Sequence, residues 1–190
     1  RYLATIVEET GHIDRLVRDL LDLAQLEAGE LTIVKEKINL TSFLPAELAK
    51  YDYMLATKQL TFRTEIPSSL PLVIADPMRL SQVMANLVSN AVRYSPDGGT
   101  IEVAAKTTPG KVTVTVSDNG PGIPLSDQPH IWDRFYRVDK SRSRQGGGTG
   151  LGLAITKHLV QAMDGEISVH SISGEGSTFA LALPVEQTKS

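Results

Sequence analysis

The chain has 190 residues and a formal net charge of −3, which suits one ordinary globular domain with room for a helical appendage. This charge gives no reason to expect binding to nucleic acid or to a membrane surface. The absence of cysteine excludes disulfides and thiolate metal sites, and it fits a reducing compartment. The sequence contains no run of about 18 apolar residues, the length that a membrane-spanning helix needs.

Residues 1–28 are predicted to form a single helix that ends at Gly29. Its apolar positions recur at heptad spacing and are Leu3, Ile6, Thr10, Ile13, Val17, Leu20 and Ala24, with Leu16, Leu21 and Leu23 widening the stripe. A stripe this wide favours a dimerising helical bundle, while packing on the chain's own domain is the alternative. Because Arg1 opens directly into this pattern, we expect the chain to be a piece of a longer protein.

After Gly29 the apolar period alternates between that of strands and that of helices. Strands are predicted at 32–40, 60–66, 72–75, 101–105, 112–116, 166–172 and 178–183, and helices at 42–57, 76–94 and 151–163. Asp76 and Pro77 form a helix-start signal, and Pro109 with Gly110 predicts a turn between two strands. Helices mixed with antiparallel hairpins predict an α+β fold, with helices covering one face of a sheet.

Residues 123–148 lack a sustained period and contain Pro124, Pro129, several charges and a glycine run. A brief helical pattern appears only near residues 131–135. Long irregular segments inside compact domains are usually functional or mobile. We therefore interpret this segment as a lid.

The predicted helix 76–94 has an apolar face and, opposite to it, a polar stripe. The apolar face consists of Leu80, Val83, Met84, Leu87, Val88 and Ala91, and the stripe of Gln82, Asn86, Asn90 and Arg93. Asparagine disfavours helices, so two of them in one stripe indicate a face that meets a ligand. An amide oxygen suits Mg²⁺, and an arginine can neutralise phosphate. A polar surface stripe is the alternative.

Asp118 follows an alternating strand and opens the sequence Asp-Asn-Gly-Pro-Gly, which by itself indicates a turn. A carboxylate at the rim of an apolar pocket would instead accept a hydrogen bond from the exocyclic amine of adenine and reject guanine. Gly120 and Gly122 lack side chains, so the backbone there could approach a flat base.

Residues 146–152 read Gly-Gly-Gly-Thr-Gly-Leu-Gly and run directly into the helical period of the next segment. This places glycine-rich backbone at a helix N-terminus, where free N–H groups and the helix dipole favour phosphate. A flexible linker is the alternative for the glycines alone. The sequence is neither a Walker-type loop nor a Rossmann fingerprint.

Together these segments resemble the catalytic domain of histidine kinases in the GHKL ATPase superfamily. The resemblance covers the N box (79–96), the first glycine box (118–122), the F box (134–139), the second glycine box (148–155) and the last glycine box (174–179). Residues 1–29, and 18–29 above all, resemble the second helix of the dimerisation and phosphoacceptor domain that precedes it. The resemblance implies an α+β Bergerat sandwich, with a mixed sheet under three helices. It also implies two units, a partial dimerisation domain at 1–29 and the ATP-binding domain at 30–190.

The resemblance further assigns roles by position. The residues implied in catalysis are Asn86, Asn90, Arg93 and Arg137, with Asn90 as the Mg²⁺ ligand. Those implied in binding ATP are Tyr94, Asp118, Gly120, Gly122, Ile123, Phe135, Tyr136, Gly148, Thr149, Gly150, Leu151, Gly152 and Ser177. Phe135 would anchor the lid, and Arg142 and Arg144 are weaker candidates on it.

The implied activity is that of a two-component sensor histidine kinase. It would transfer the γ-phosphoryl of Mg-ATP to a histidine for relay to a response-regulator aspartate, mainly by positioning and charge neutralisation. The expected acceptor motif is missing, because His12 is followed by Ile13 and Asp14. We therefore expect the acceptor upstream of Arg1, and no autophosphorylation by this chain alone. The implied partners are the phosphoacceptor helix of the same or a partner protomer, a receiver domain and, in the full-length protein, a second copy.

The implied location is the cytosolic part of a membrane-bound sensor. Three other readings share the same nucleotide motifs. One is an ATPase or pseudokinase whose output is a conformational change. Another is a docking module with a vestigial site. The third is an anti-sigma-factor serine kinase, which lacks the leading heptad helix.

Overall fold

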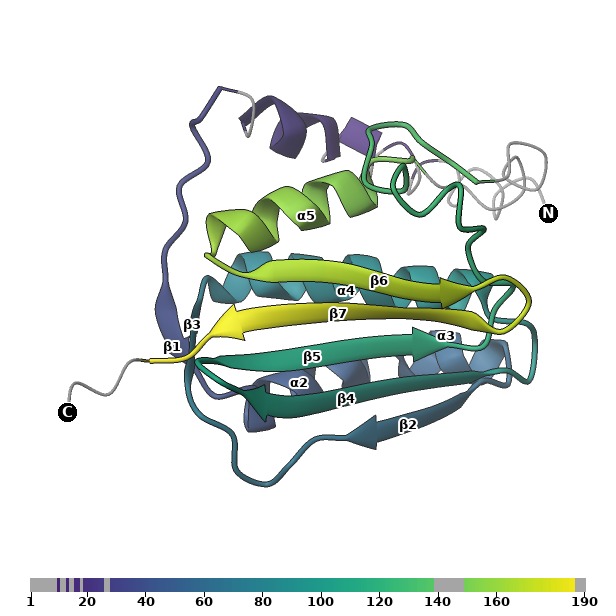
Figure 1. Cartoon of the computed structure of the whole chain (residues 1–190), viewed down its shortest axis with the longest axis horizontal. Coiled ribbons are helices and arrows are strands. Elements are labelled where there is room, and N and C mark those ends of the chain that lie inside the picture. Colours follow the sequence, from purple (N-terminus) through teal and green to yellow (C-terminus); the bar gives the residue numbers. More distant parts are fainter. Residues whose placement is uncertain are drawn as a thin grey trace.

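The structure is a computed structural model that describes residues 10, 13, 16–17, 19–25, 28–138 and 149–186 (Figure 1). The predictions made for Leu3, Ile6, His12, Arg142, Arg144 and Gly148 lie outside the described residues. The same holds for the distal part of the predicted lid, from 139 to 148.

A five-stranded mixed sheet forms the centre of the molecule, with strand order β2-β4-β5-β7-β6. The strands are β2 (Thr61–Glu65), β4 (Thr100–Thr108), β5 (Lys111–Asp118), β6 (Glu166–Ile172) and β7 (Gly176–Pro184). β2 runs parallel to β4, and all other neighbours are antiparallel. The sheet therefore consists of two hairpins, β4–β5 and β6–β7, with β2 added at one edge.

The helices lie on one face of this sheet (Figure 1). They are α2 (Leu40–Leu48), the 3₁₀ turn η1 (Ala49–Tyr51), α3 (Asp52–Thr57), α4 (Pro77–Tyr94) and α5 (Gly152–Ala162). β1 (Glu36–Ile38) and β3 (Val73–Ala75) form a separate two-stranded antiparallel sheet at the side. This arrangement confirms the predicted α+β fold.

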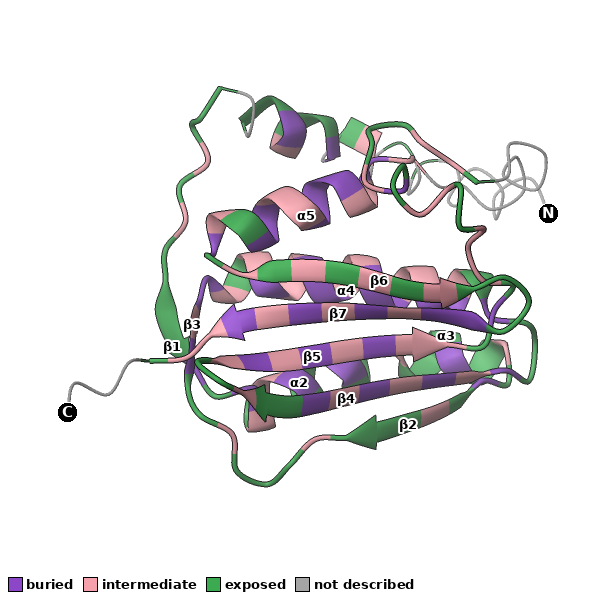
Figure 2. Cartoon of the chain, in the orientation of Figure 1, coloured by how far each residue is buried: buried purple, intermediate pink, exposed green. Residues whose placement is uncertain are grey.

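The core lies between the sheet and α4, as the two apolar periods require (Figure 2). Alternate residues of the central strands are buried, among them Val103, Val114 and Leu181. The predicted apolar face of α4 is buried throughout, at 0–3% exposure from Leu80 to Ala91. The apolar residues that recur every second position on the strands and every 3.6 positions on the helix thus pack together in one apolar layer.

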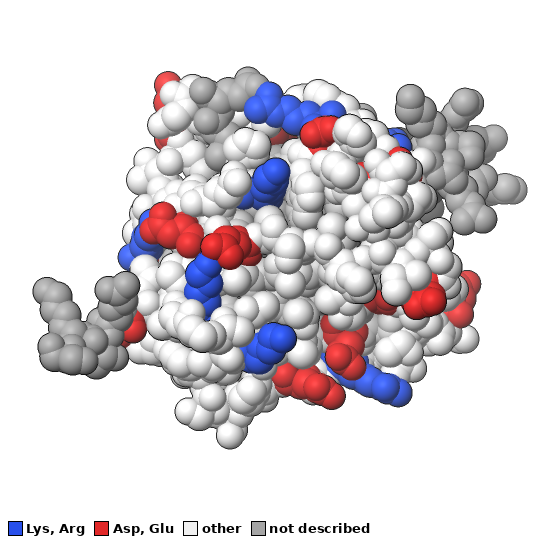
Figure 3. Space-filling model, viewed as in Figure 1, with Lys and Arg blue, Asp and Glu red and all other residues white. Residues whose placement is uncertain are grey.

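The opposite face of the sheet is open and carries small or polar side chains. Thr113 and Thr115 of β5 lie on this face, and Ala104 of β4 lies opposite Thr115 in the ladder. Figure 3 views the molecule from this side and shows Lys and Arg interspersed with Asp and Glu over a largely uncharged surface. This largely antiparallel, mixed sheet is therefore buried on one side and solvated on the other.

Two predicted boundaries differ from the structure. The segment 32–40 is a strand only from Glu36 to Ile38, because the side chain of Asn39 accepts a hydrogen bond from the Thr41 amide and begins α2 at Leu40. The helix predicted at 42–57 is interrupted by η1 between α2 and α3. The apolar period alone does not reveal this change of helical type.

The N-terminal helix ends where the sequence predicts. Gly29 has a φ of +67°, and the amide of Glu30 donates to the carbonyl of Gln25 at 3.0 Å, as in a Schellman cap. The described helical residues 19–25 lie over α5 (Figure 1). In the part of the chain that the structure describes, no helix is long and apolar enough to cross a membrane.

Asp76 joins the segment that follows this helix to α4. Its Oδ1 accepts from the amides of Met78 and Arg79 and caps α4, as predicted. Its Oδ2 accepts from the amide of Val34 at 2.9 Å, and the residue is only 6% exposed. One buried carboxylate thus fixes both the start of α4 and the chain that leads to it.

Candidate nucleotide site

The polar stripe of α4 faces α5 rather than bulk solvent. Asn86 is half-buried, and its Nδ2 donates to the Gly152 carbonyl and to Thr156 Oγ1, both at 3.2 Å. Thr156 is fully buried, and nothing in the sequence pointed to it as a partner of the stripe. The structure thus brings Asn86 and Gly152, two predicted site residues, into direct contact.

Asn90 and Arg93 lie further along the same stripe and are also half-buried. Neither side chain forms a hydrogen bond or ion pair with another residue in the described ranges. Tyr94, at the end of α4, is 55% exposed. One amide oxygen and one guanidinium are therefore available to a ligand at the C-terminal end of this helix.

Lys58 holds that end of α4 in place. Its ammonium donates to the carbonyls of Val92, Arg93 and Ser95 at 2.8, 3.1 and 3.0 Å. A cation at a helix C-terminus satisfies the last carbonyls and the helix dipole. Lys58 cannot be recognised from the sequence as the partner of this helix end, because it lies 34 residues before Val92 and only the fold brings the two together.

Asp118 ends β5 and lies opposite Ser177 of β7. Its Oδ1 accepts from the amide of Gly120 at 2.9 Å. Burial raises the pKa of the Asp118 carboxyl above its ordinary value, and the backbone N–H groups of Gly120 and Ser177 oppose this rise. A partly desolvated carboxylate is thus held in one orientation at the end of the strand.

The glycine turn after Asp118 packs closely against its own chain. A Cβ on Gly120 would lie 2.8 Å from the Tyr94 carbonyl oxygen, and a Cβ on Gly122 only 2.1 Å from the Ile172 carbonyl oxygen. Gly122 also has a φ of +68°. These glycines therefore have a structural requirement within the chain. Their approach to a base remains a prediction.

Ser171 links this turn to the last glycine box. Its hydroxyl accepts from the Ile123 amide at 2.8 Å and donates to the Gly176 carbonyl at 2.7 Å. Ser177 Oγ lies 3.0 Å from the same hydroxyl. Gln128 adds hydrogen bonds from its Nε2 to the carbonyls of Ile123 and Ser171. Neither Ser171 nor Gln128 belongs to a predicted motif.

The segment predicted to be a lid begins directly after this turn, and its described part consists of a series of turns up to residue 138. Phe135 has a φ of +61° and is 61% exposed, and its amide donates to the Gly150 carbonyl at 2.9 Å. A Cβ on Gly150 would meet the Phe135 backbone at 2.8 Å. The predicted lid is therefore joined to the second glycine box through the main chain of Phe135, while the ring stays exposed.

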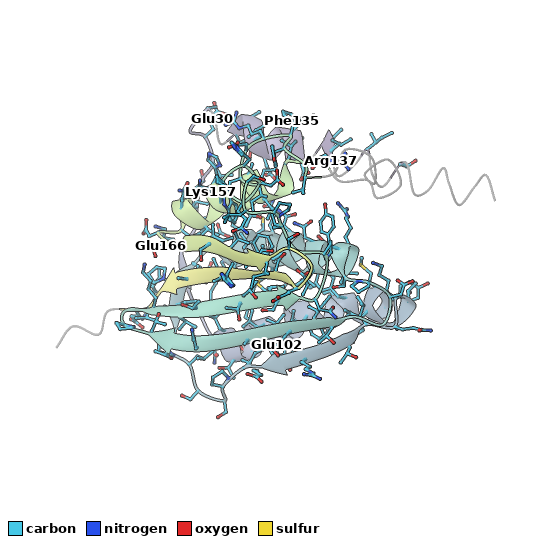
Figure 4. The ribbon with its side chains drawn as sticks, turned by 45° about the vertical axis from the view of Figure 1, so that its right-hand side comes forward. Glu30, Glu102, Phe135, Arg137, Lys157 and Glu166 are labelled. Atoms are coloured by element: carbon cyan, nitrogen blue, oxygen red, sulfur yellow. The ribbon has the colours of Figure 1, made fainter. Side chains whose placement is uncertain are left out.

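Tyr136 and Arg137 follow on the same segment. The hydroxyl of Tyr136 donates to Asp127, and this hydrogen bond raises the pKa of Tyr136 above its ordinary value. The Tyr136 hydroxyl is thus bound within the lid in this structure, and its predicted contact with phosphate remains untested. Arg137 is half-buried, and Figure 4 shows it with Phe135 beside the N-terminal helix.

The described end of the second glycine box starts α5. Thr149 Oγ1 accepts from the amide of Leu151 at 3.1 Å, and the Leu151 side chain is fully buried. The Thr149 hydroxyl donates to Asp19 Oδ2 of the N-terminal helix at 2.9 Å. The predicted phosphate loop therefore contacts the N-terminal helix through Asp19, a contact that the sequence did not predict.

Asp22 provides a second contact of this kind. It accepts from Gln82 Nε2 at 2.6 Å and from Arg79 Nη1 at 3.2 Å, both on α4. The sequence shows Asp19 and Asp22 three residues apart on a helix, which places them on one face. It gives no sign of where that face would dock.

Comparison with known proteins identifies the family. Residues 75–187 match the model of histidine kinase-, DNA gyrase B-, and HSP90-like ATPases. The chain is 38% identical over 188 residues to the sensor protein kinase WalK of Staphylococcus aureus strain MRSA252, covering 98% of this chain and 31% of that protein. WalK of Staphylococcus haemolyticus strain JCSC1435 is 38% identical over 187 residues. The chain thus spans about a third of the length of these relatives.

Solved histidine kinases share the fold. Full-length ShkA in complex with AMPPNP matches with a TM-score of 0.83 and 27% identity, covering 98% of this chain and 39% of that one. The nucleotide-free catalytic domain of ThkA matches with a TM-score of 0.69 and 25% identity, covering 82% and 97%. Because the family model spans more than half of the chain, this chain belongs to the family of histidine kinase-, DNA gyrase B-, and HSP90-like ATPases.

Proposed function

We propose that this chain is the ATP-binding catalytic part of a two-component sensor histidine kinase. It binds Mg-ATP between α4, the turn after β5, the lid and the start of α5. It transfers the γ-phosphoryl to a histidine outside residues 1–190, and that histidine passes the group to a response-regulator aspartate. The protein's part in this reaction is to position the groups and to neutralise charge.

The observation that carries the proposal is the geometry of Asp118. Its carboxylate is held by the Gly120 amide at 2.9 Å, at the end of β5 and beside the last turn of α4. A fixed, partly desolvated acceptor would bind the exocyclic amine of adenine and repel the carbonyl of guanine. Ser177 lies beside it in the ladder and would complete the base-binding end.

The phosphate end would use the stripe of α4 and the start of α5. The Asn90 amide oxygen would bind Mg²⁺, with phosphates and water as the remaining ligands. In the ranges that the structure describes, no three His, Asp or Glu side chains converge on a ready-made metal site. Arg93 and Arg137 would neutralise phosphate charge, and Asn86 would hold Gly152 beside the phosphates.

The relatives support this proposal. WalK is named a sensor protein kinase, ShkA was solved with AMPPNP, and ThkA was solved with the response regulator protein TrrA. By this analogy the partners are a phosphoacceptor helix, a receiver domain and a second copy in the full-length protein. The chain would work on the cytosolic side of a membrane-bound sensor.

Calorimetric titration with ATP, with and without Mg²⁺ and alongside GTP, tests the proposal. We expect Mg²⁺-enhanced binding of ATP and no binding of GTP at the same concentrations. Phosphoryl transfer is then measured after adding a helix that carries the acceptor histidine. Equal binding of ATP and GTP, or no binding at millimolar nucleotide, would contradict the proposal.

A further inference from the structure

The N-terminal helix presents two carboxylates to the predicted phosphate end of the site. Asp19 Oδ2 accepts from Thr149 Oγ1 at 2.9 Å, and Asp19 is 9% exposed. Asp22 accepts from Gln82 at 2.6 Å and from Arg79 at 3.2 Å. We call this set of five residues the acidic clasp.

In the first contact, the Thr149 hydroxyl of the second glycine box already donates its hydrogen bond to Asp19. Thr149 has one hydroxyl proton, and it is donated to Asp19. The lone pairs of the same hydroxyl accept from the Leu151 amide at 3.1 Å, next to the first residue of α5. A negative charge thus lies one hydroxyl group away from a helix N-terminus, where the dipole favours an anion. A phosphate brought to this position would meet both an occupied donor and a like charge.

The second contact ties down the beginning of α4. The ion pair of Asp22 with Arg79 is largely shielded from water, because the two side chains are 18% and 17% exposed. Arg79 Nη1 also donates to Gln82 Oε1 at 3.1 Å, so the two α4 partners are linked. Gln82 lies on the same stripe as Asn86. The clasp therefore spans from the glycine box to the first turns of the helix that lines the site.

The docked face of the helix differs from its heptad seam. Leu23 is 7% exposed and packs with the core, whereas Leu20 and Leu21 are 47% and 59% exposed. Ile13 and Val17 are also largely exposed. The helix thus docks through its acidic side and Leu23, which leaves the apolar seam free for a second helix.

We infer that the acidic clasp competes with the phosphates of the nucleotide. The docked helix lowers the affinity for ATP, and bound ATP in turn weakens the docking of the helix, because the coupling free energy between two ligands of one site is reciprocal. This inference rests on the proposed function and adds a way in which the first unit of the chain regulates the site. The inferred competition is specific to the phosphates, because the hydrogen bonds that define the clasp end on Thr149, Gln82 and Arg79 and not on Asp118 or the glycine turn that follows it.

The test uses charge removal at nearly constant shape. Asp19→Asn, Asp22→Asn and the double variant are titrated by calorimetry with Mg-ATP and with adenosine. The matched control is Glu30→Gln, because Glu30 is exposed beyond the end of the same helix. We expect the double variant to bind Mg-ATP at least about fivefold more tightly than the original chain. Its affinity for adenosine, and the affinities of the control, should stay unchanged.

A gain of affinity is informative because damage to the fold would lower affinity instead. If the original chain binds Mg-ATP and the double variant binds it equally or more weakly, the inference is wrong and the proposed function stands. An equal gain for adenosine contradicts the phosphate-specific competition. If no variant and no control binds ATP, the proposed function fails, and the inference fails with it.

Reciprocity gives a second, structural test. The chain contains no cysteine, so Leu21→Cys and Ser168→Cys provide unique positions for a pair of spin labels. Both side chains are exposed, one on the helix and one on β6. Saturating Mg-ATP should lengthen or broaden the measured label-to-label distance, and adenosine should not. An unchanged distance under saturating Mg-ATP would overturn the inference.

Discussion

The two ends of the candidate site are built in different ways. At the end proposed to bind the base, Asp118, Gly120, Gly122 and Ser171 are fixed by strand ladders and by contacts within the turn. At the end proposed to bind phosphate, Thr149 is instead held by a separate helix, and the Gly150 backbone is held by the lid.

This difference suggests separate roles for the two ends, with recognition of the base at one and regulation of phosphate binding at the other. The proposed base end is held by the β5–β7 ladder and by hydrogen bonds of the turn that follows β5, so local opening of this part of the sheet is needed to release it. The proposed phosphate end instead depends on contacts with two segments outside the sheet, the N-terminal helix and the predicted lid. If the acidic clasp acts as inferred, repositioning the N-terminal helix would change the affinity for phosphate and leave the proposed recognition of the base unchanged.

The largest expected effect comes from breaking the base end. In Gly122→Ala the new Cβ would lie 2.1 Å from the Ile172 carbonyl oxygen, at a φ of +68°. We expect a loss of at least about 3 kcal/mol in the free energy of unfolding, measured by urea titration. Gly110→Ala is the control, because its φ is +72° but nothing lies within 4 Å, and it should cost about 1 kcal/mol. Equal losses would mean that the close packing of the turn is unimportant.

Removing the lysine that caps the C-terminus of α4 should lower the stability of the fold. In Lys58→Met three carbonyls lose their shared cation, and we expect a loss of about 2 kcal/mol in the free energy of unfolding. Lys106→Met, on the open face of the sheet, is the control and should change stability by less than about 0.5 kcal/mol. Similar results for the two variants would show that Lys58 does not hold the helix end.

Asp118→Asn should weaken nucleotide binding through the proposed base end alone. The amide keeps the shape and can still accept from the Gly120 amide, but it loses the charge that strengthens a hydrogen bond to the adenine amine. We expect calorimetry to show about tenfold weaker binding of Mg-ATP, or about 1.4 kcal/mol, with unchanged circular dichroism. Unchanged affinity would remove Asp118 from the site.

The same variant makes the pH dependence testable. Because burial raises the pKa of Asp118, the native state holds this proton more tightly than the unfolded state does. The resulting stabilisation is fully present below the unfolded pKa, about 3.9, and is lost as the pH rises through the raised native pKa. Asp118→Asn should therefore be more stable than the original chain at neutral pH, with the difference disappearing in acid. Thermal melting at several pH values measures it.

Asn90→Ala tests the phosphate end through the metal. If the Asn90 oxygen binds Mg²⁺, the variant should lose about fivefold, or about 1 kcal/mol, of the Mg²⁺-enhanced ATP affinity. Binding of ATP in EDTA should not change. Ser89→Ala, one position earlier on α4, is the control, because its hydroxyl bonds to the Asn86 carbonyl. Full Mg²⁺ enhancement in Asn90→Ala would place the metal elsewhere.

The sequence predicted best where period and local chemistry agree. The apolar face of α4, its Asp76 cap and the Gly29 cap are all present in the structure, since each depends on residues close together in the chain. The strand at 32–40 was overestimated, because Asn39 begins a helix within an apolar run. Such a boundary is hard to predict when the apolar period of a segment indicates a strand and a capping residue within it indicates a helix.

The motifs of the candidate site could be predicted from the sequence, but the residues that hold those motifs in place could not. Asn90, Asp118 and Thr149 stand in recognisable patterns, whereas Lys58 and Ser171 are ordinary residues that matter only through distant partners. The contact between Asp19 and Thr149 joins positions 130 residues apart. No periodicity encodes such a pair, because it depends on how the first helix lies on the finished domain.

Asp76 should slow the amide hydrogen exchange of one residue in the segment 30–35. Val34 lies outside any strand, and an amide in an irregular surface segment normally exchanges with solvent deuterium quickly. The Val34 amide is instead bound to a buried carboxylate that also starts α4. Its exchange should therefore be slow and should follow the opening of the α4 N-terminus. A single slow amide in this segment would report on whether the connection between the first helix and the catalytic domain is intact.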